Sequence, residues 1–171
     1  MFLRITKYNP AYRNEKGHYL KDEWTAPCDI GKEFEGVELT LEKYLEVEQA
    51  HTDAILILMR NLNVGSFKVI QLMKVGYEDL AGERNAELKK FYDALHGDQT
   101  IGIDQIPSVV KLFKRELIGG KLFSEELEIH FGYDYYMYAV SKDQSEKSVA
   151  EINESGLFAE DFRSPYIDED E

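Results

Sequence analysis

The sequence predicts an α+β fold, in which one domain holds a mixed or antiparallel sheet of about four strands packed against three to four helices. Its 171 residues are about one domain's worth, and a composition of 43% apolar and 12% aromatic residues supplies a core that disordered chains lack. Helical and strand-like patterns follow one another without a linker rich in Gly, Pro or Ser. We therefore expect residues 1–171 to form a single domain, with residues 167–171 as a frayed acidic tail.

The first strand and the segment after it follow from residue type. Phe2–Tyr8 mixes β-branched, aromatic and polar residues, which favours a strand. Asn9-Pro10 should end this strand, because proline lacks a backbone donor and biases the residue before it away from helix. Residues 11–39 are polar and irregular. We expect them to wrap over the surface with a few aromatic anchors.

The helix predicted over Leu41–Asn61, with Thr40 as its N-cap, has the clearest pattern. A largely apolar stripe has spacings of three and four: Tyr44, Val47, His51, Ile55, Leu58 and Leu62. Polar residues with the same kind of spacing lie opposite: Glu42, Glu46, Gln49 and Asp53. This second face is expected to point into water.

The remaining elements are predicted from similar patterns. Phe67–Val75 is dense in Val, Ile, Leu and Met, which indicates a buried central strand. Two helices are expected at Glu83–Leu95 and from about Asp104 to Leu117, and Gly119-Gly120 should stop the second. A hairpin and a short helix complete the set: Leu127–Phe131, Tyr135–Ser141 and Ser145–Asn153.

The formal net charge of -13 is concentrated in two stretches. Residues 33–53 carry a net -6 and residues 160–171 a net -5, so the rest of the chain carries only -2. Such a field attracts cationic partners and repels nucleic acid and anionic membranes. The helix face with Glu42, Glu46 and Asp53 is the rigid part of this charge, whereas the C-terminal part is expected to be mobile.

Motifs that would identify an enzyme or a cofactor site are missing from the sequence. It contains neither G-x-x-x-x-G-K-[ST] nor G-x-G-x-x-G, and no two histidines have the H-E-x-x-H spacing. Gly119-Gly120-Lys121 follows a predicted helix rather than a strand, which favours a helix cap and a turn over a phosphate site. We therefore expect no cofactor and no metal.

Three patterns allow a chemical role beside an ordinary structural one. His130 and Asp134 flank the predicted hairpin turn, where they either form a neutral pair or act in acid–base chemistry. His51 lies on the apolar stripe and is expected to be a core histidine bonded to a neighbour. Cys28 would need a distant histidine to act as a nucleophile, and the adjacent Asp29 opposes thiolate formation.

The one basic concentration in the sequence lies near the end of the third predicted helix: Lys111, Lys114, Arg115 and Lys121. Cations at that place complement the negative end of the helix dipole. A docking site for the acidic tail is the alternative. Nucleic-acid binding would need a larger basic footprint in so acidic a protein.

The predicted hairpin is rich in tyrosine: Tyr133, Tyr135, Tyr136 and Tyr138. Alternation along a strand should place one set in the core and leave the other partly exposed. Tyrosine often anchors an interface, although it also favours strands for reasons of packing alone. We include Tyr135 and Tyr136 among the candidate contacts.

These features favour a small acidic cytoplasmic protein that binds a basic protein partner, in its specific form an immunity-type inhibitor of a nuclease-like toxin. The cytoplasm is expected because the sequence has one cysteine, no signal-peptide pattern and no apolar run near ~20 residues. A small hydrolase that uses His130, Asp134 or Cys28, and an accessory subunit of a larger assembly, are the alternatives. The predicted partner-binding residues are Glu42, Glu46, Asp53, Tyr135 and Tyr136.

Overall fold

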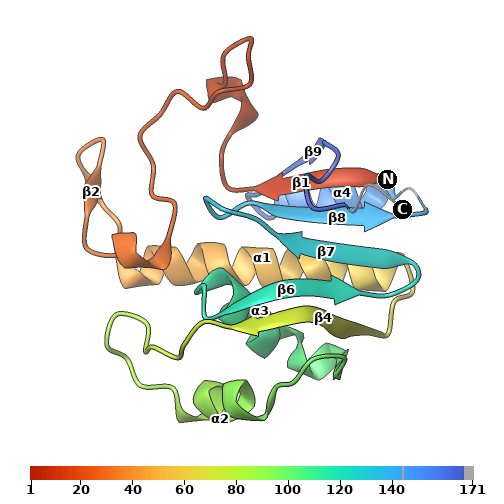
Figure 1. Cartoon of the computed structure of the whole chain (residues 1–171). Coiled ribbons are helices and arrows are strands. Elements are labelled where there is room, and N and C mark those ends of the chain that lie inside the picture. The colour runs from red at the N-terminus through yellow and green to blue at the C-terminus, as the bar shows by residue number, and fades with distance from the viewer. Residues whose placement is uncertain (144, 168–171) are drawn as a thin grey trace.

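The computed structural model describes residues 1–143 and 145–167. Within these residues the chain forms a seven-stranded sheet, antiparallel throughout, and four α-helices (Figure 1). The strand order is β5-β4-β6-β7-β8-β1-β9. The α+β class is thus confirmed, and the expected sheet of about four strands is too small. The predicted tail, apart from Ile167, lies outside the described residues.

The strands of the large sheet are β1 (Phe2–Thr6), β4 (Ser66–Lys74), β5 (Thr100–Gly102), β6 (Ile118–Phe123), β7 (Leu127–Phe131), β8 (Met137–Ser141) and β9 (Phe158–Asp161). The α-helices are α1 (Leu41–Asn61), α2 (Ala86–Ala94), α3 (Ile106–Lys114) and α4 (Glu146–Glu154). A separate small hairpin consists of β2 (Glu33–Phe34) and β3 (Val37–Glu38). Short 3-10 turns are η1 (Pro10–Tyr12), η2 (Pro27–Asp29) and η3 (Ile103–Gln105).

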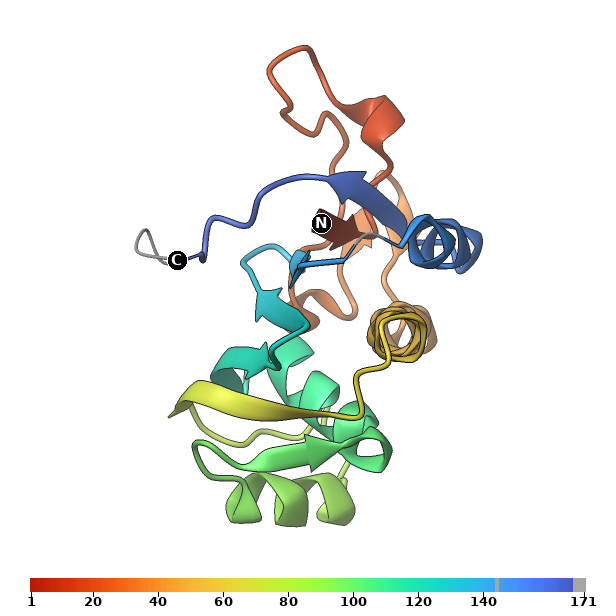
Figure 2. The same cartoon turned by 90° about the vertical axis from the view of Figure 1, so that its right-hand side faces the viewer.

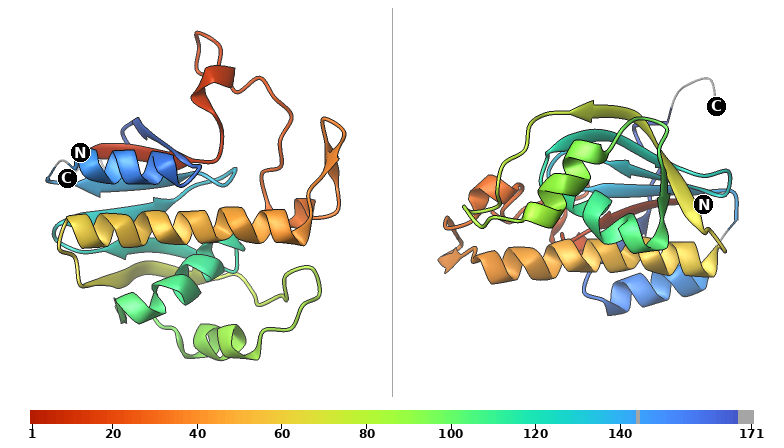
Figure 3. Two further views of the ribbon diagram at one scale, coloured as in Figure 1. Left: turned by 180° about the vertical axis from the view of Figure 1, so that it is seen from behind. Right: turned by 90° about the horizontal axis from the view of Figure 1, so that it is seen from below.

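The helices α1, α3 and α4 lie together on one face of the large sheet, with α1 between the other two (Figure 3). Seen from the side, the segment that follows β9 runs over the opposite face of the sheet (Figure 2). The core between sheet and helices contains side chains with no exposed surface, among them Ile5, Ile55, Leu58, Leu122 and Ile129. Each aliphatic side chain buried in this way stabilises the fold by about 1.5–3 kcal/mol.

The helix α1 has the boundaries that its pattern predicts. The Thr40 hydroxyl accepts a hydrogen bond from the Lys43 backbone N–H at 3.2 Å, which caps the N-terminus. Its buried face includes residues of the predicted stripe together with others beside them: Tyr44, Glu48, His51, Thr52, Ala54, Ile55, Leu58 and Met59. Glu42 and Glu46 are exposed as predicted, whereas Asp53 is half-buried.

The prediction that Gly119-Gly120 ends a helix in a turn is wrong, because both glycines belong to β6. β6 pairs with β4, whose ladder shifts register between Ile70 and Met73. Gly120 has a φ of +134°, and a Cβ there would lie 2.7 Å from the Ile70 carbonyl oxygen. The glycine is needed where the two backbones approach closely, which helix-cap statistics could not indicate.

Other predicted boundaries shift for local reasons. The strand predicted from Tyr135 begins at Met137, because Tyr135 and Asp134 have positive φ angles of 65° and 53° and form the turn. The second helix begins only after Asn85, whose side chain accepts a hydrogen bond from the Leu88 N–H at 2.9 Å. The edge strands β5 and β9 are three and four residues long. Strands of that length hardly show an alternating pattern.

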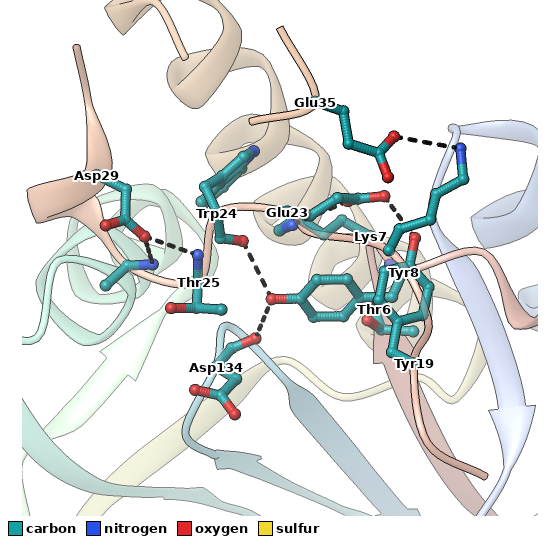
Figure 4. Close-up of polar contacts among 12 residues, drawn as sticks. Thr6, Lys7, Tyr8, Tyr19, Glu23, Trp24, Thr25, Asp29, Glu35 and Asp134 are labelled. Atoms are coloured by element: carbon teal, nitrogen blue, oxygen red, sulfur yellow. Dashed lines mark hydrogen bonds and ion pairs between the residues drawn. The ribbon is translucent and has the colours of Figure 1, made fainter. Parts of the chain in front are cut away.

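The segment between β1 and α1 is anchored over one end of the sheet, as expected, by aromatic residues. The Tyr8 hydroxyl lies between two backbone carbonyls, 3.1 Å from that of Trp24 and 2.9 Å from that of Asp134 (Figure 4). The centre of the Trp24 ring lies 5.5 Å from the centre of the Tyr44 ring of α1 and 4.8 Å from that of Tyr135. These contacts fix the start of α1 relative to the β7–β8 turn.

No helix within the described residues is both long and apolar enough to cross a bilayer.

Candidate functional site

The first acidic stretch forms a surface that we call the acidic end: Glu33, Glu35, Glu38, Glu42 and Glu46. The first three belong to the β2–β3 hairpin and the last two to the first turns of α1. All five side chains are exposed. The hairpin projects beside the N-terminus of α1 both in the view of Figure 1 and when seen from below in Figure 3. The acids therefore gather at one end of the molecule.

The arrangement of the hairpin acids is unfavourable for the hairpin itself. Glu33 and Glu38 are direct partners across the β2–β3 ladder, and like charges in that position repel. The turn between them places Glu35 and Gly36 at φ angles of +50° and +82°, as a two-residue hairpin loop requires. Glutamate is an uncommon residue at a positive φ. Local stability therefore does not account for the acids at these positions.

Few cations neutralise the acidic end. Lys43 lies 2.8 Å from Glu46, and Lys21 lies 3.8 Å from Glu35. These pairs are exposed, and such pairs contribute little to stability. Among the described residues, no ion pair involves Glu33, Glu38 or Glu42. Val37, which pairs with Phe34, is 70% exposed on the other side of the ladder from Glu33 and Glu38.

Asp53 differs from the other predicted helix acids. It lies seven residues after Glu46, about 10 Å further along the helix axis. Its carboxylate accepts a hydrogen bond from the Gln49 amide at 2.9 Å, and the residue is half-buried. The acidic end therefore includes Glu42 and Glu46 but not Asp53.

The tyrosines of the β7–β8 turn are also divided. Tyr135 is only 4% exposed and packs edge-on against Tyr44 at 5.7 Å, so it does not offer its ring to a partner. Tyr136 is half-buried and packs 5.2 Å from Tyr8, with the Arg4 guanidinium 5.5 Å from its ring centre. The exposed ring is that of Tyr133, at 85%. Because residues 134 and 135 form a turn, strand alternation could not identify it.

Glu48 belongs to the same acidic stretch, but it is buried, which was not predicted. It is 1% exposed, and its two carboxylate oxygens each lie 2.7 Å from the Arg115 guanidinium. A signal was present, since Glu48 lies four residues after Tyr44 and three before His51, on the buried stripe. Arg115 itself is 67 residues away in the chain.

Of the four basic residues predicted to gather near the end of α3, Lys111 is half-buried and the other three are held within the protein. Lys114 is buried, its ammonium donates to the Tyr135 carbonyl at 2.8 Å, and burial, together with the charge of Lys7, holds its pKa well below the usual range. Arg115 is occupied by Glu48, and Lys121 is buried 3.5 Å from Glu128. The acidic tail, apart from Ile167, lies outside the described residues, so its docking at these cations stays a prediction.

The predicted core histidine is confirmed. His51 has no exposed surface, and its Nδ1 lies 2.8 Å from the Val47 carbonyl oxygen, one turn earlier in α1. Burial, followed by the charge of Lys114, lowers the pKa of His51 well below its usual value. The side chain is therefore neutral in the folded protein near neutral pH.

His130 does not pair with Asp134, contrary to one interpretation of the hairpin. Its Nδ1 lies 2.6 Å from the Ser164 hydroxyl, and its Nε2 lies 2.8 Å from Glu128 Oε1, off the line of a well-formed hydrogen bond. The contact with His130 lowers the pKa of Glu128. Ser164 was not predicted, because it follows His130 by 34 residues and has no characteristic spacing. Cys28 is a free, exposed thiol on η2.

Comparison with known proteins gives this surface no precedent, because no protein-family model, curated protein or solved structure matches the chain. The fold and the site geometry therefore carry the functional argument.

Proposed function

We propose that the protein binds a basic protein partner through the acidic end, as an immunity-type inhibitor of a nuclease-like toxin. The observation that carries this proposal is the exposure of five clustered glutamates, of which Glu33 and Glu38 face each other across a two-stranded ladder. Their mutual repulsion falls when a cationic surface approaches. A partner is thus attracted both by the long-range field and by relief of that repulsion.

A nuclease is the favoured class of partner because its own substrate is a polyanion. Nucleic-acid sites carry Lys and Arg that neutralise phosphates. Carboxylates spaced along β2–β3 and α1 would occupy such cations and compete with the phosphate backbone. The exposed free thiol of Cys28 fits the reducing cytoplasm, where an inhibitor of this kind would protect its own cell.

The proposal is tested by the kinetics of binding to a panel of catalytically inactive basic nuclease domains. We expect at least one to associate rapidly at about 0.01 M ionic strength and more slowly at about 0.15 M, because salt screens exposed charges. The variant Glu33→Gln/Glu38→Gln/Glu42→Gln should slow association roughly tenfold and change dissociation much less.

The matched control removes the same charge from other exposed positions without ion pairs in the described structure: Glu87→Gln, Asp98→Asn and Asp104→Asn. At about 0.15 M ionic strength, where the Debye length is about 8 Å, this control should leave the association rate within about twofold of the wild type. Equal slowing in both triple variants would show that net charge, and not the acidic end, governs binding. Absence of binding across the panel would contradict the nuclease assignment.

A hydrolase is the second candidate, because the imidazole of His130 lies between the Ser164 hydroxyl and the Glu128 carboxylate. A hydroxyl, an imidazole and a carboxylate in this order are the parts of an activated nucleophile. Ser164 is buried and also accepts a hydrogen bond from the Tyr166 N–H at 3.2 Å, which suits an anchor for the C-terminal segment equally well. A fluorophosphonate probe that labels the wild type but not Ser164→Ala would favour the hydrolase. An unlabelled, folded wild type would exclude this nucleophile.

A further inference from the structure

A hollow of about 210 Å³ lies between the first turns of α1, the end of α3 and the loop that leads into α2. In both views of Figure 3 this loop lies at the end of the molecule where α1 begins. Leu45 of α1 and the buried Leu80 form the apolar part of its lining. The residues that line the hollow are all different from those of the acidic end, so the two are separate surfaces.

Three cations line this hollow from two elements. Arg84 comes from the loop before α2, and Lys111 and Arg115 come from the end of α3. The two residues of α3 are four positions apart, so they share one face of the helix. Lys111 is half-buried, and the Arg115 side chain is only 10% exposed. The hollow thus has a cationic border, part of which is held in place by burial.

These cations are only partly neutralised within the protein. Arg115 presents Nε and Nη2 to Glu48, each at 2.7 Å, and its Nη1 has no hydrogen-bond partner in the described structure. Among the described residues, neither Arg84 nor Lys111 has an ion pair or a side-chain hydrogen bond. Glu83 also lines the hollow and pairs with neither of them. Acids outnumber Lys and Arg by 33 to 20 in this chain, yet no described acid pairs with these two cations.

The fold itself accounts for only part of this arrangement. Lys111 and Arg115 complement the negative end of the α3 dipole. Arg84 belongs to another element and does not benefit from that dipole, and like charges brought together repel. On its loop, Asp79 accepts a hydrogen bond from the Asn85 N–H at 3.4 Å and forms no ion pair with Arg84 in the described structure. An anionic ligand would remove the repulsion between the three cations.

We propose that this hollow binds a phosphate group, either free or on a small organic ester. Near pH 7 a phosphate ester carries a charge of about −1.5 to −2, and its oxygens accept hydrogen bonds in several directions. One such group can meet Arg84, Lys111 and the free Nη1 of Arg115 together. A carboxylate carries a single charge and lies in one plane, so it would leave part of the cationic border unpaired.

The size and the surroundings of the hollow limit the ligand. Its volume of about 210 Å³ equals that of about seven waters at roughly 30 Å³ each, and sites for drug-sized ligands begin at about 300 Å³. A phosphate group with a few carbon atoms fits, and the carbon atoms would lie against Leu45 and Leu80. A nucleic acid would bring many phosphates to the end of the molecule that carries the acidic end, which opposes its binding.

The test follows amide chemical shifts of the full chain in an NMR titration with inorganic phosphate at about pH 7.5 and about 0.15 M ionic strength. We expect saturable shifts at residues 83–86 and 111–115. The variant Arg84→Gln/Lys111→Gln should weaken phosphate binding about three- to tenfold, as expected for the loss of two partly exposed ion pairs. Glu83→Gln should strengthen it about twofold, because it removes the acid of the lining. Arg115 is left unchanged, since it also neutralises Glu48.

A matched control removes the same charge at the other end of the sheet. Lys68→Gln/Lys142→Gln changes two exposed lysines that have no ion pair in the described structure, and it should leave phosphate affinity within about twofold. Chloride at matched ionic strength should not reproduce the shifts. Equal weakening by both double variants, the same shifts with chloride, or no saturable shift would overturn the proposal.

A second titration with methyl phosphate distinguishes the two sources of the phosphate group. Affinity at least equal to that of inorganic phosphate, with further shifts at Leu45 and Leu80, would assign the hollow to an ester. Weaker binding of methyl phosphate would assign it to free phosphate. The proposal does not depend on the acidic end, so its failure leaves binding of a nuclease by that surface unaffected.

Discussion

The acidic side chains of residues 33–53 lie in two environments: most are exposed to water, and Glu48 is buried against an arginine. At the acidic end, Glu33, Glu38 and Glu42 face water without an ion pair in the described structure, and the first two repel each other. Glu48, two residues after Glu46, is buried against Arg115. The exposed acids add to the electrostatic field and hardly to stability, whereas loss of the buried acid alone would leave Arg115 without its counter-charge.

Two lysines near this buried pair, Lys114 and Lys7, also have little contact with water. The ammonium of Lys114 lies 4.1 Å from the centre of the Tyr135 ring and donates to a backbone carbonyl. Burial, partly offset by Glu23, lowers the pKa of Lys7 to about 8. Net charge counted from sequence treats these groups as equal to the exposed acids. Only the structure separates charges that a partner can meet from charges that belong to the core.

The largest expected effect comes from breaking the buried pair. Glu48→Gln should reduce the free energy of unfolding by about 3 kcal/mol, because it leaves the Arg115 guanidinium buried without a counter-charge. Chemical denaturation monitored by circular dichroism measures this change. The neighbouring exposed variant Glu46→Gln is the control and should change stability by less than about 0.5 kcal/mol.

A double replacement sharpens the same comparison. Glu48→Met/Arg115→Met removes both charges and should recover most of the stability that Glu48→Gln loses, since apolar residues of similar volume often replace a buried pair without loss. If the single Glu48→Gln variant were as stable as Glu46→Gln, the two environments would not differ in the way proposed.

The sequence predicts which acids of α1 point outward, but it does not predict that Glu48 meets Arg115. Helical spacing identifies both ends of α1 and the outward positions of Glu42 and Glu46, because these depend on residues three and four apart. Arg115 is brought to Glu48 by the packing of α3 on α1, which no local spacing reports. The same reason hides the partnership of His130 and Ser164. The role of Gly120 could not be predicted, because it depends on the register shift in another strand, β4, against which its backbone packs.

A smaller effect is expected for Lys114→Met, and it should depend on pH. In the unfolded chain the lysine amine has a pKa of about 10.4, and burial in the folded protein lowers it. The unfolded state therefore binds more protons between the two pKa values, and wild-type stability falls as the pH drops below about 10. Methionine removes this loss, which should outweigh the roughly 1 kcal/mol lost when the Tyr135 carbonyl has no donor, so the free energy of unfolding should rise at pH 7.

Denaturation of both proteins at pH 7 and at about pH 10 checks the sign. The advantage of Lys114→Met over the wild type should shrink at the higher pH, where the unfolded amine also begins to lose its proton. A constant difference at both values would show that Lys114 stays charged in the fold. Lys111→Met, which removes one positive charge from a half-buried position of the same helix, serves as the control.

The smallest effect on stability is expected at the acidic end, where a substitution should stabilise the protein and not destabilise it. Glu38→Lys places an opposite charge across the ladder from Glu33 and should raise the free energy of unfolding by about 0.5 kcal/mol. If the hairpin exists to meet a cationic partner, the same substitution should slow association, because it removes an acid and adds a repelling charge. A gain in stability with a loss in association rate would mean that the glutamates are kept for binding at the expense of the hairpin. Thermal denaturation and stopped-flow association on the same preparation measure both, and an unchanged association rate would assign the acids to solvation alone.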